Sequence, residues 1–310
     1  MEFVLKKFMF SIFYVVLLFL CLYPFVIFVC GNLLKNYNTN ILYRDTPTAD
    51  FLISRLHEVK EVRDVDILFL GSSHAYRGFD PRNFPEYKIF NLASSSQTEI
   101  QTRFLLDSYL DQLNPKIVVY EVFPELLKND GVESAVRFLS FEKLSSGIIL
   151  MALRTLDIRV LNTLIYKFMA KILNKDSNIS ETQIKKNQKY IPGGYVEREI
   201  SFGVKEDFSE YEIDLKTNQF RHFKKNIKLL KQRDIPVVLV FAPIIENRYN
   251  RYLNIILFNQ AMSEITTYIN FNDIMNLDDN IDFYDSHHLN QNGVNKFNKK
   301  LLIKIKELEK

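Results

Sequence analysis

Hydrophobic and polar residues follow a regular pattern after about residue 65. Short, continuous apolar runs alternate there with longer segments in which apolar residues recur every three or four positions. The runs are typical of strands buried on both faces of a sheet, and the longer segments are typical of amphipathic helices. This alternation predicts an α/β fold with a parallel sheet covered by helices on both faces. The predicted strands are 67–70, 88–92, 117–123, 237–241 and 268–271, and the predicted helices are 99–113, 218–233, 252–267 and 293–309.

The first apolar segment has a different character. Residues 8–29 contain no charge, and about 20 such residues are enough to cross a bilayer core. A cleaved signal peptide has a shorter apolar region and a small-residue cleavage site, and none is evident before Asn32. We therefore expect a tail and transmembrane anchor over residues 1–33. Lys6 and Lys7 precede the span, which favours a cytoplasmic N-terminus and an extracytoplasmic globular domain in the cell membrane.

The remaining organisation follows from these two patterns. Residues 34–65 are expected to form a stem with a helix at 50–62, and residues 66–310 one domain with an insertion at about 138–212. The first part of this insertion is helical and apolar, but its charges exclude a second simple span. One interpretation is a helical cap on the domain. The other is a lid, or an interfacial surface that lies on the membrane near the anchor. The polar remainder contains Pro192-Gly-Gly194 and predicts a long loop or a hairpin.

Composition excludes several classes of protein. The formal net charge of +3 is too weak to indicate nucleic-acid binding. Cys21 and Cys30 are the two cysteines, and both lie in the first apolar segment. The globular part therefore has neither a disulfide framework nor a cysteine metal site.

The chemistry of the chain is expected where the first strand ends. The run Ile67–Leu70 stops at Gly71, and Ser72 and Ser73 follow at once. In an open parallel sheet this edge is where ligands bind. A serine becomes a nucleophile only when a base removes its proton and an acid orients that base. A candidate pair lies far along the chain, because Asp285 and His288 are three residues apart in a predicted loop before the last helix.

His287 is the competing base in this motif. A histidine pair can also be half of a metal site, but further ligands would have to be grouped elsewhere in the chain. His57, His74 and His222 show no such grouping along the sequence. We therefore expect no metal and no cofactor, and we expect packing or surface roles for His74 and His287.

Together and in this order, these blocks resemble the SGNH (GDSL-like) hydrolase superfamily. The blocks are Gly71-Ser-Ser73, Asn91-Leu-Ala-Ser-Ser-Ser-Gln-Thr98, Asn114-Pro115 before the third strand, and Asp285-x-x-His288. The resemblance implies a flavodoxin-like three-layer α/β/α sandwich. It also implies that Ser73 is the nucleophile, His288 the base and Asp285 the acid that orients the base.

Two departures from the family pattern affect the oxyanion hole. Ser96 stands where the family has a glycine whose backbone N–H binds the oxyanion together with that of the nucleophile, Ser73; a backbone donor survives the change. The family's Gly-x-Asn-Asp block is absent, and the chain reads Glu121-Val-Phe-Pro-Glu125 there. Loss of one oxyanion donor costs about 10²–10³ in turnover. Gln97 is a candidate substitute, and Ser72, Glu121 and His287 are expected to line the site.

With the anchor, these departures resemble SGNH-like proteins that work beside membrane-bound O-acyltransferases. The resemblance implies acyl transfer through a Ser73 ester, with a cell-envelope polysaccharide or its acyl donor as substrate and water or a sugar hydroxyl as acceptor. A membrane-bound O-acyltransferase is the expected protein partner. The alternative is an SGNH-like scaffold that has lost efficient catalysis and binds a glycan or such an acyltransferase. A third class, a small-ligand-binding flavodoxin-like domain, is disfavoured because no phosphate-cradling glycine-rich loop is present.

Overall fold

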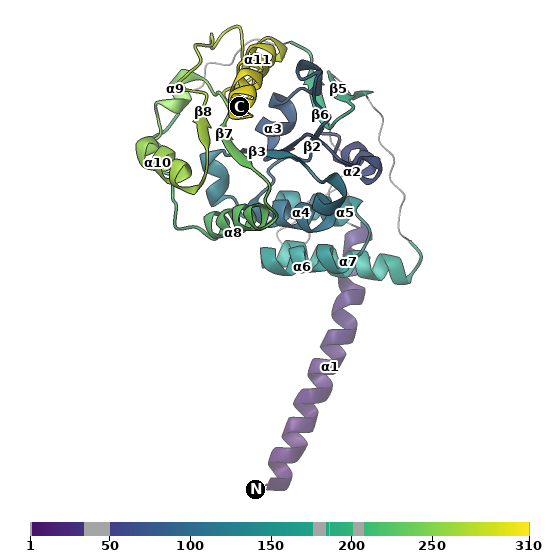
Figure 1. Ribbon diagram of the computed structural model, residues 1–310. Helices are drawn as coiled ribbons and strands as arrows, with labels where there is room; N and C mark the ends of the chain where they lie inside the picture. The colour runs from purple at the N-terminus through teal and green to yellow at the C-terminus, as the bar shows by residue number, and fades with distance from the viewer. Residues whose placement is uncertain (1, 34–49, 176–183, 186, 201–207, 310) are drawn as a thin grey trace. The chain divides into compact units, whose positions relative to one another are not determined.

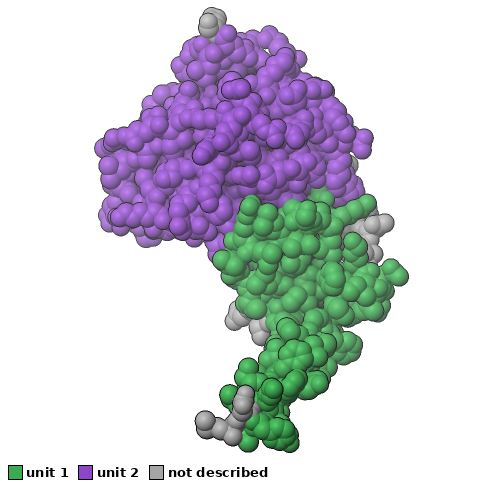
Figure 2. Space-filling view, turned by 60° about the horizontal axis from the view of Figure 1, so that its bottom comes forward, with its two compact units in different colours: residues 1–46, 135–179 green, residues 47–134, 180–310 purple. Residues whose placement is uncertain are grey.

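The computed structural model describes residues 2–33, 50–175, 184–185, 187–200 and 208–309. The chain divides into two compact units, which Figure 2 shows in different colours. Unit 1 comprises residues 1–46 and 135–179, and unit 2 comprises residues 47–134 and 180–310. The alternation of strands and helices seen in the sequence lies in unit 2.

A five-stranded parallel sheet forms the centre of unit 2 (Figure 1). The strand order is β2-β1-β3-β7-β8, and all four neighbouring pairs are parallel. This is the order of flavodoxin-like folds, in which the second strand lies outside the first. The predicted parallel sheet is confirmed; β1 and β7 have the predicted bounds, and the other three strands are one or two residues shorter than expected. The strands are β1 (Ile67–Leu70), β2 (Ile89–Asn91), β3 (Ile117–Glu121), β7 (Val237–Phe241) and β8 (Tyr268–Asn270).

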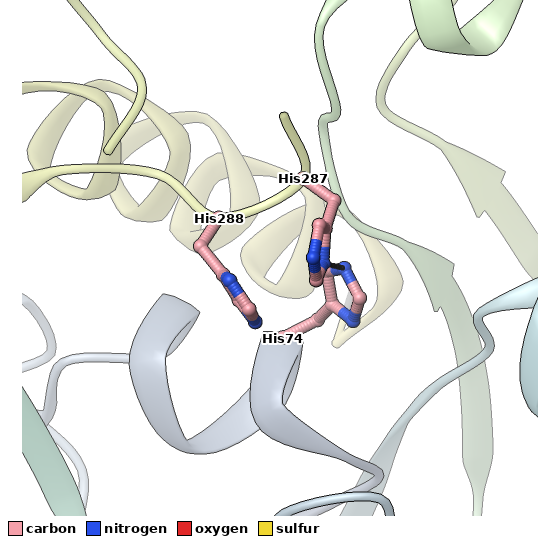
Figure 3. A group of neighbouring side chains, drawn as sticks. All are labelled: His74, His287 and His288. Carbon is pink, nitrogen blue, oxygen red and sulfur yellow. Dashed lines mark hydrogen bonds between the residues drawn. The ribbon is translucent and has the colours of Figure 1, made fainter. Parts of the chain in front are cut away.

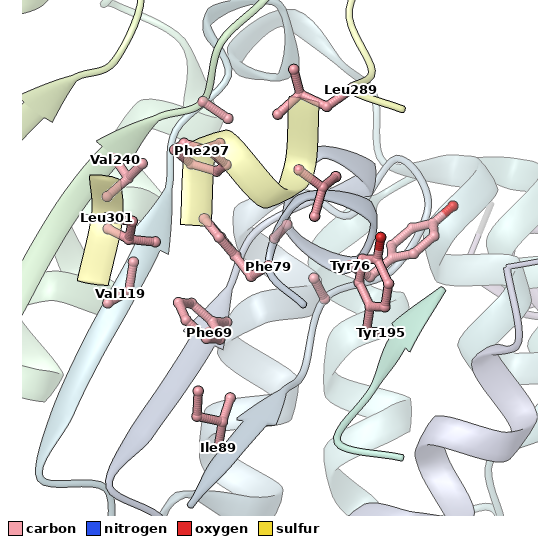
Figure 4. Packing of buried hydrophobic residues seen from close by; sticks show 14 of the residues in the cluster. Phe69, Tyr76, Phe79, Ile89, Val119, Tyr195, Val240, Leu289, Phe297 and Leu301 are labelled. Atoms are coloured by element: carbon pink, nitrogen blue, oxygen red, sulfur yellow. The ribbon is translucent and has the colours of Figure 1, made fainter. Parts of the chain in front are cut away.

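Both faces of this sheet are buried, which explains why its strands read as continuous apolar runs. On one face, Phe69 of β1 stacks on Phe79 with ring centroids 4.4 Å apart, and Phe297 packs in the same cluster (Figure 4). On the other face, Tyr120 of β3 meets Phe223 edge to face at 5.4 Å. Alternate residues of one strand therefore contact different helical layers.

The covering helices carry sequence signals at their first residues. Thr98 and Gln101 form a capping box at the start of α4 (Glu99–Leu113). Thr217 caps α8 (Asn218–Gln232), and Asn290 caps α11 (Gln291–Leu308) by accepting from two backbone N–H groups. The other helices of unit 2 are α2 (Leu52–Glu61), α3 (Ser73–Gly78), η1 (Pro81–Asn83), η2 (Pro124–Lys128), α9 (Glu246–Tyr249) and α10 (Ile255–Ile265).

The boundaries of the predicted stem and insertion differ from this division. The helix expected in the stem is α2, and its residues Leu52, Leu56 and Val59 are buried within unit 2. The polar part of the insertion also belongs to unit 2, where β5 (Gln188–Ile191) and β6 (Tyr195–Arg198) form an antiparallel hairpin next to the two-residue β4 (Ile184–Lys185). Residues 34–49 of the stem lie outside the described residues.

A glycine attaches this hairpin to the edge strand β2. The carbonyl of Gly193 accepts a hydrogen bond from the backbone N–H of Asn91 at 2.8 Å. Gly194 has φ +88°, and a Cβ there would lie 2.2 Å from the carbonyl oxygen of Asn91. Only glycine permits this approach of two backbones. The edge of the sheet is thereby covered.

Unit 1 is helical. It contains α1 (Glu2–Leu33), most of α5 (Val132–Phe141), α6 (Ser146–Thr155) and α7 (Ile158–Ile172). Residues Phe3–Leu33 of α1 are long and apolar enough to cross a membrane, and only 11% of their most apolar window is buried. Such a helix is compatible with a single-pass anchor or with a signal sequence.

Candidate active site

The candidate site begins at the glycine that ends β1. Gly71 has φ +139°, and a Cβ at this position would lie 2.6 Å from Oε2 of Glu121. The backbone conformation and the close approach of Glu121 therefore both require glycine. The chain turns here, and Ser72 caps the short helix α3, whose first residue is Ser73. This places Ser73 at the carboxyl edge of the sheet, as the sequence predicts.

Ser73, His288 and Asp285 form one continuous chain of hydrogen bonds. The Oγ of Ser73 lies 2.8 Å from Nε2 of His288. The Nδ1 of His288 lies 2.8 Å and 3.0 Å from the two carboxylate oxygens of Asp285. Because Nδ1 faces a carboxylate, it carries the ring hydrogen, and Nε2 is left to accept the proton of Ser73. Side chains 215 positions apart in the sequence are thus brought into contact.

The loop that carries Asp285 and His288 is held by its own backbone. Oδ1 of Asp285 accepts from the backbone N–H groups of His287 and His288 at 3.0 Å and 2.8 Å. The backbone N–H of Tyr284 donates to the carbonyl of His288 at 2.8 Å. Asn290 then caps α11 directly after the loop. The carboxylate is therefore fixed relative to the imidazole before any ligand binds.

The pKa values of His288 and Asp285 are both lowered in the folded protein. Burial lowers the pKa of His288, although the hydrogen bond and charge of Asp285 oppose that shift. Burial of Asp285 favours its neutral form, but the hydrogen bond and charge of His288 outweigh this effect and lower the pKa of the carboxyl. At neutral pH the pair is thus a neutral imidazole beside a carboxylate, which is the state needed for a general base.

A second histidine pair lies beside this chain (Figure 3). Nε2 of His74 and Nδ1 of His287 are 3.1 Å apart, and the ring of His74 lies 5.0 Å from that of His288. The expectation that His74 would not be grouped with the other two was wrong. His74 follows Ser73 directly and turns inward on the first turn of α3, a direction that sequence spacing does not reveal. Burial lowers the pKa of His287 to about 3 and that of His74 well below its usual range, so both rings are neutral.

These three imidazoles are the described residues that could hold a metal ion. One ring nitrogen from each of His74, His287 and His288 lies within 4.8 Å of the other two. Neutral imidazole is a ligand for zinc and similar ions. Coordination by Nε2 of His288 would, however, occupy the lone pair that faces Ser73. The absence of a metal in the working site stays a prediction.

Glu121 lies at the end of β3, next to the candidate nucleophile. Its Oε2 accepts from the backbone N–H and from Oγ of Ser72, both at 2.9 Å. Its other oxygen is buried and has no hydrogen-bond partner among the residues that the structure describes. Burial raises the pKa of Glu121 to about 7, against the opposing effect of the two bonds from Ser72. The expected proximity of this carboxylate to the site is therefore seen in the contact with Ser72.

The predicted oxyanion residues after β2 make local contacts. Oγ of Ser96 donates to Glu133 at 2.9 Å, and the residue has a left-handed φ of +49°. The side chain of Gln97 bonds Ser94 and Thr102, at 2.9 Å and 3.0 Å. Both polar ends of Gln97 are thus used within its own loop and α4. The role of the Ser96 backbone N–H as an oxyanion donor stays a prediction.

Two arginines near the site were not anticipated from the sequence. Arg248 of α9 forms a bidentate pair with Glu125 at 2.7 Å and donates to Oγ of Ser286 at 3.0 Å. Arg198 of β6 lies 3.7 Å from Asp285 and stacks over the ring of Tyr284. Isolated arginines far from the motifs carry no sequence signal, and only the fold shows that they flank the Asp285 loop.

Comparison with known proteins yields structural likeness alone. No family model and no curated protein matches the chain. Among solved structures, the chain is similar to a putative acylhydrolase from Bacteroides fragilis, with 12% identity, a TM-score of 0.40, and coverage of 84% of this chain and 99% of that one. It is also similar to a GDSL-like lipase from Bacteroides thetaiotaomicron, with 12% identity, a TM-score of 0.41, and coverage of 83% and 100%. The chemistry of the site rests on its own geometry.

Proposed function

We propose that this protein is a membrane-anchored, SGNH-like serine esterase or O-acyltransferase. The observation that carries the proposal is the hydrogen-bonded chain from Ser73 through His288 to Asp285 at the carboxyl edge of a parallel sheet. A serine, a neutral imidazole and a carboxylate in this order form an activated nucleophile in acyl-transfer enzymes on unrelated folds.

The geometry supports a two-step reaction. Oγ of Ser73 attacks the carbonyl carbon of an acyl ester while Nε2 of His288 takes its proton. The protonated imidazole then gives this proton to the leaving alkoxide, which departs as an alcohol and leaves an acyl-serine. Water or a sugar hydroxyl next transfers its proton to His288 and attacks the acyl carbon. The bond between the acyl carbon and Oγ of Ser73 then breaks, and His288 returns the proton to this oxygen. Asp285 holds the imidazole and stabilises its positive charge in both steps.

Substrate and location follow from the resemblance and from α1. We propose that α1 anchors the protein in the cell membrane with a cytoplasmic N-terminus, and that unit 2 acts outside the cytoplasm on acyl esters of cell-envelope polysaccharide. A membrane-bound O-acyltransferase is the proposed protein partner. Hydrolysis and transfer share the acyl-serine and differ only in the hydroxyl that attacks it.

A second candidate function is supported by Glu121. A carboxyl group hydrogen-bonded to Ser72 stands where related enzymes carry an oxyanion block with a neutral asparagine donor. A charged carboxylate near the developing oxyanion would oppose catalysis. The alternative is therefore a scaffold with weak or no turnover that binds a glycan or an acyltransferase.

Covalent labelling distinguishes the two functions. The full-length protein in detergent is incubated with a fluorophosphonate probe and, separately, with p-nitrophenyl acetate, and its intact mass is measured. We expect one adduct on Ser73. The variants Ser73→Ala and His288→Ala should lose it, with at least about a 10³-fold slower reaction.

Ser72→Ala is the matched control, because it removes a neighbouring hydroxyl that contacts Glu121 and His74 but not His288. It should label at a rate closer to that of the unmodified protein. Labelling lost in Ser72→Ala and kept in Ser73→Ala would contradict the assignment of the nucleophile. An unlabelled, folded protein would favour the scaffold.

A further inference from the structure

The outer surface of the α6–α7 helix pair is strongly hydrophobic. Nearly all exposed side chains between Ser146 and Leu173 are large and apolar; Ser146 and Lys171 are the exceptions. At Leu156, in the turn between the helices, 81% of the residue surface is exposed. The apolar members, which we call the α6–α7 surface, are Ile149, Leu150, Leu153, Leu156, Ile158, Phe168, Ile172 and Leu173.

Many large apolar side chains exposed on one helix pair are unfavourable in water and mark a contact site. The opposite side of α7 is buried and contains small or polar residues, among them Val160, Asn162 and Ala170. The helix is therefore amphipathic, and large hydrophobic residues such as Phe168 and Ile172 are exposed on its outer side. Something apolar must cover them in the working molecule.

The contacts of α7 with α1 indicate what covers this surface. The hydroxyl of Tyr23 donates to Asn162 at 2.7 Å, and the ring of Phe28 stacks on that of Tyr166 at 5.4 Å. Tyr166 also donates to Asn32 at 3.2 Å. All three contacts involve the last third of α1, so α7 crosses that helix near its C-terminal end.

The length of α1 fixes the depth of this crossing. A bilayer core is about 30 Å thick and is crossed by about 20 helical residues. Counted from the uncharged start at Phe8, such a span ends near Ile27. Tyr23, Phe28 and Asn32 therefore lie at the boundary between hydrocarbon and headgroups, where tyrosine is enriched in membrane proteins.

We propose that the α6–α7 surface lies in the membrane interface, as a second, monotopic membrane contact next to the end of α1. The occupant is the lipid leaflet from which α1 emerges. Basic residues flank the apolar ones, including Lys171 and Lys175 at the end of α7, and they match the anionic headgroups of such a leaflet. The inference rests on the proposed anchoring by α1.

Depth-dependent quenching tests the proposal. In a Cys21→Ser, Cys30→Ser background, single cysteines at Leu153 or Leu156 of the full chain are labelled with the fluorophore NBD. The protein is placed in vesicles of phosphatidylethanolamine and phosphatidylglycerol that contain lipids with a nitroxide either near the headgroup or deep in the acyl chain. We expect blue-shifted emission at both positions and a greater loss of intensity with the shallow nitroxide.

Two controls separate this inference from the anchoring itself. Leu18→Cys, an exposed position in the middle of α1, should be quenched most by the deep nitroxide, and Asn280→Cys in unit 2 by neither. If Leu18 is quenched but Leu153 and Leu156 behave like Asn280, the α6–α7 surface does not contact lipid, and a protein partner must cover it. If Leu18 is also unquenched, the anchor proposal fails and this inference fails with it.

Discussion

The two units of this protein depart from the usual distribution of side chains in opposite ways, each in one region. Unit 2 buries ionisable and polar groups at one edge of its sheet, among them His74, Glu121 and His288. Unit 1 exposes large hydrophobic residues, such as Leu156 and Phe168. Burial of a polar group is tolerated when hydrogen bonds compensate for lost water, and exposure of an apolar surface when another apolar surface covers it.

This difference is the basis for the kind of ligand that we propose for each unit. In unit 2 the buried groups are bonded mainly to one another, from Asp285 through His288 to Ser73 and from Glu121 to Ser72. A buried network of this kind holds its members rigidly in place. In unit 1 the exposed residues have no comparable partners within the described part of the chain. The first pattern is the basis of the proposed catalysis, and the second is the basis of the proposed contact with lipid.

The largest expected effect concerns the polar network. Asp285→Asn keeps the size of the side chain but no longer selects the imidazole tautomer with hydrogen on Nδ1. Turnover of p-nitrophenyl acetate should fall by about 10⁴-fold. In the unmodified protein, turnover should rise with pH as His288 loses its proton, with a midpoint below pH 6.5 because burial lowers the pKa of this imidazole.

His287→Gln is the matched control for this variant. His287 contacts Asp285 through its backbone N–H, and that bond survives the substitution. We expect turnover to stay within about tenfold of the unmodified protein. If His287→Gln abolished turnover and His288→Gln did not, the base would be His287 and the proposed network would be incorrect.

The next largest effect is expected from truncating hydrophobic side chains, one buried in unit 2 and one exposed in unit 1. Phe69→Ala removes a fully buried ring of β1 and should lower the free energy of unfolding by about 3–5 kcal/mol. Leu153→Ala truncates a side chain of similar apolar character, but 49% of its surface is exposed, and the change should stay within about 0.5 kcal/mol. Denaturant unfolding in detergent measures both. Equal losses would show that Leu153 is part of a protein core.

The smallest of these effects is the pH dependence contributed by Glu121. Its pKa rises from 4.5 to about 7 on folding because the carboxyl is buried. Between these values the unfolded chain releases the proton and the folded protein keeps it, so stability falls as pH rises, by at most about 3 kcal/mol. Glu121→Gln should therefore gain stability relative to the unmodified protein between pH 5 and pH 8.

Glu99→Gln is a useful second variant, because burial also raises the pKa of Glu99 to about 7. It should change the pH dependence of unfolding in the same direction. If the difference in free energy of unfolding between Glu121→Gln and the unmodified protein were the same at pH 5 and at pH 8, Glu121 would not titrate in this window.

Much of the fold was predictable because its cause is local. Runs such as Val237–Phe241 are buried on both faces, and that pattern identifies central strands without knowledge of their neighbours. Capping residues mark the first residues of α4 and α11; α4 begins at the predicted residue, and α11 begins at Gln291, two residues before the predicted start. The grouping of α2 with unit 2 was not predictable, because it depends on tertiary packing of Leu52 and Val59 rather than on the pattern of the helix itself.

The candidate site was only partly predictable. Asp285 and His288 share one short motif, the resemblance of the ordered sequence blocks to a known family associated this motif with Ser73, and the fold brings the three side chains together. The inward position of His74 depends on the direction of one side chain on α3, and that of Arg198 on a hairpin packed against a distant loop. Neither leaves a periodic signal in the sequence. The roles of Ser96 and Gln97 were inferred from resemblance; Gln97 bonds Ser94 in its own loop, whereas Ser96 bonds Glu133 of α5, a contact that depends on tertiary packing.

The docking of α11 on α3 has a consequence for biosynthesis. Asn298 bonds the carbonyl of Gly78 and the backbone N–H of Asp80, more than 200 positions earlier in the chain. Contacts between such distant segments form late, because a long loop must close first. A nascent chain that has emerged only as far as β8 holds Ser73 without its base. Because His288 stands directly before α11 in the sequence, the proposed triad of Ser73, His288 and Asp285 is completed only when nearly the whole chain has been synthesised.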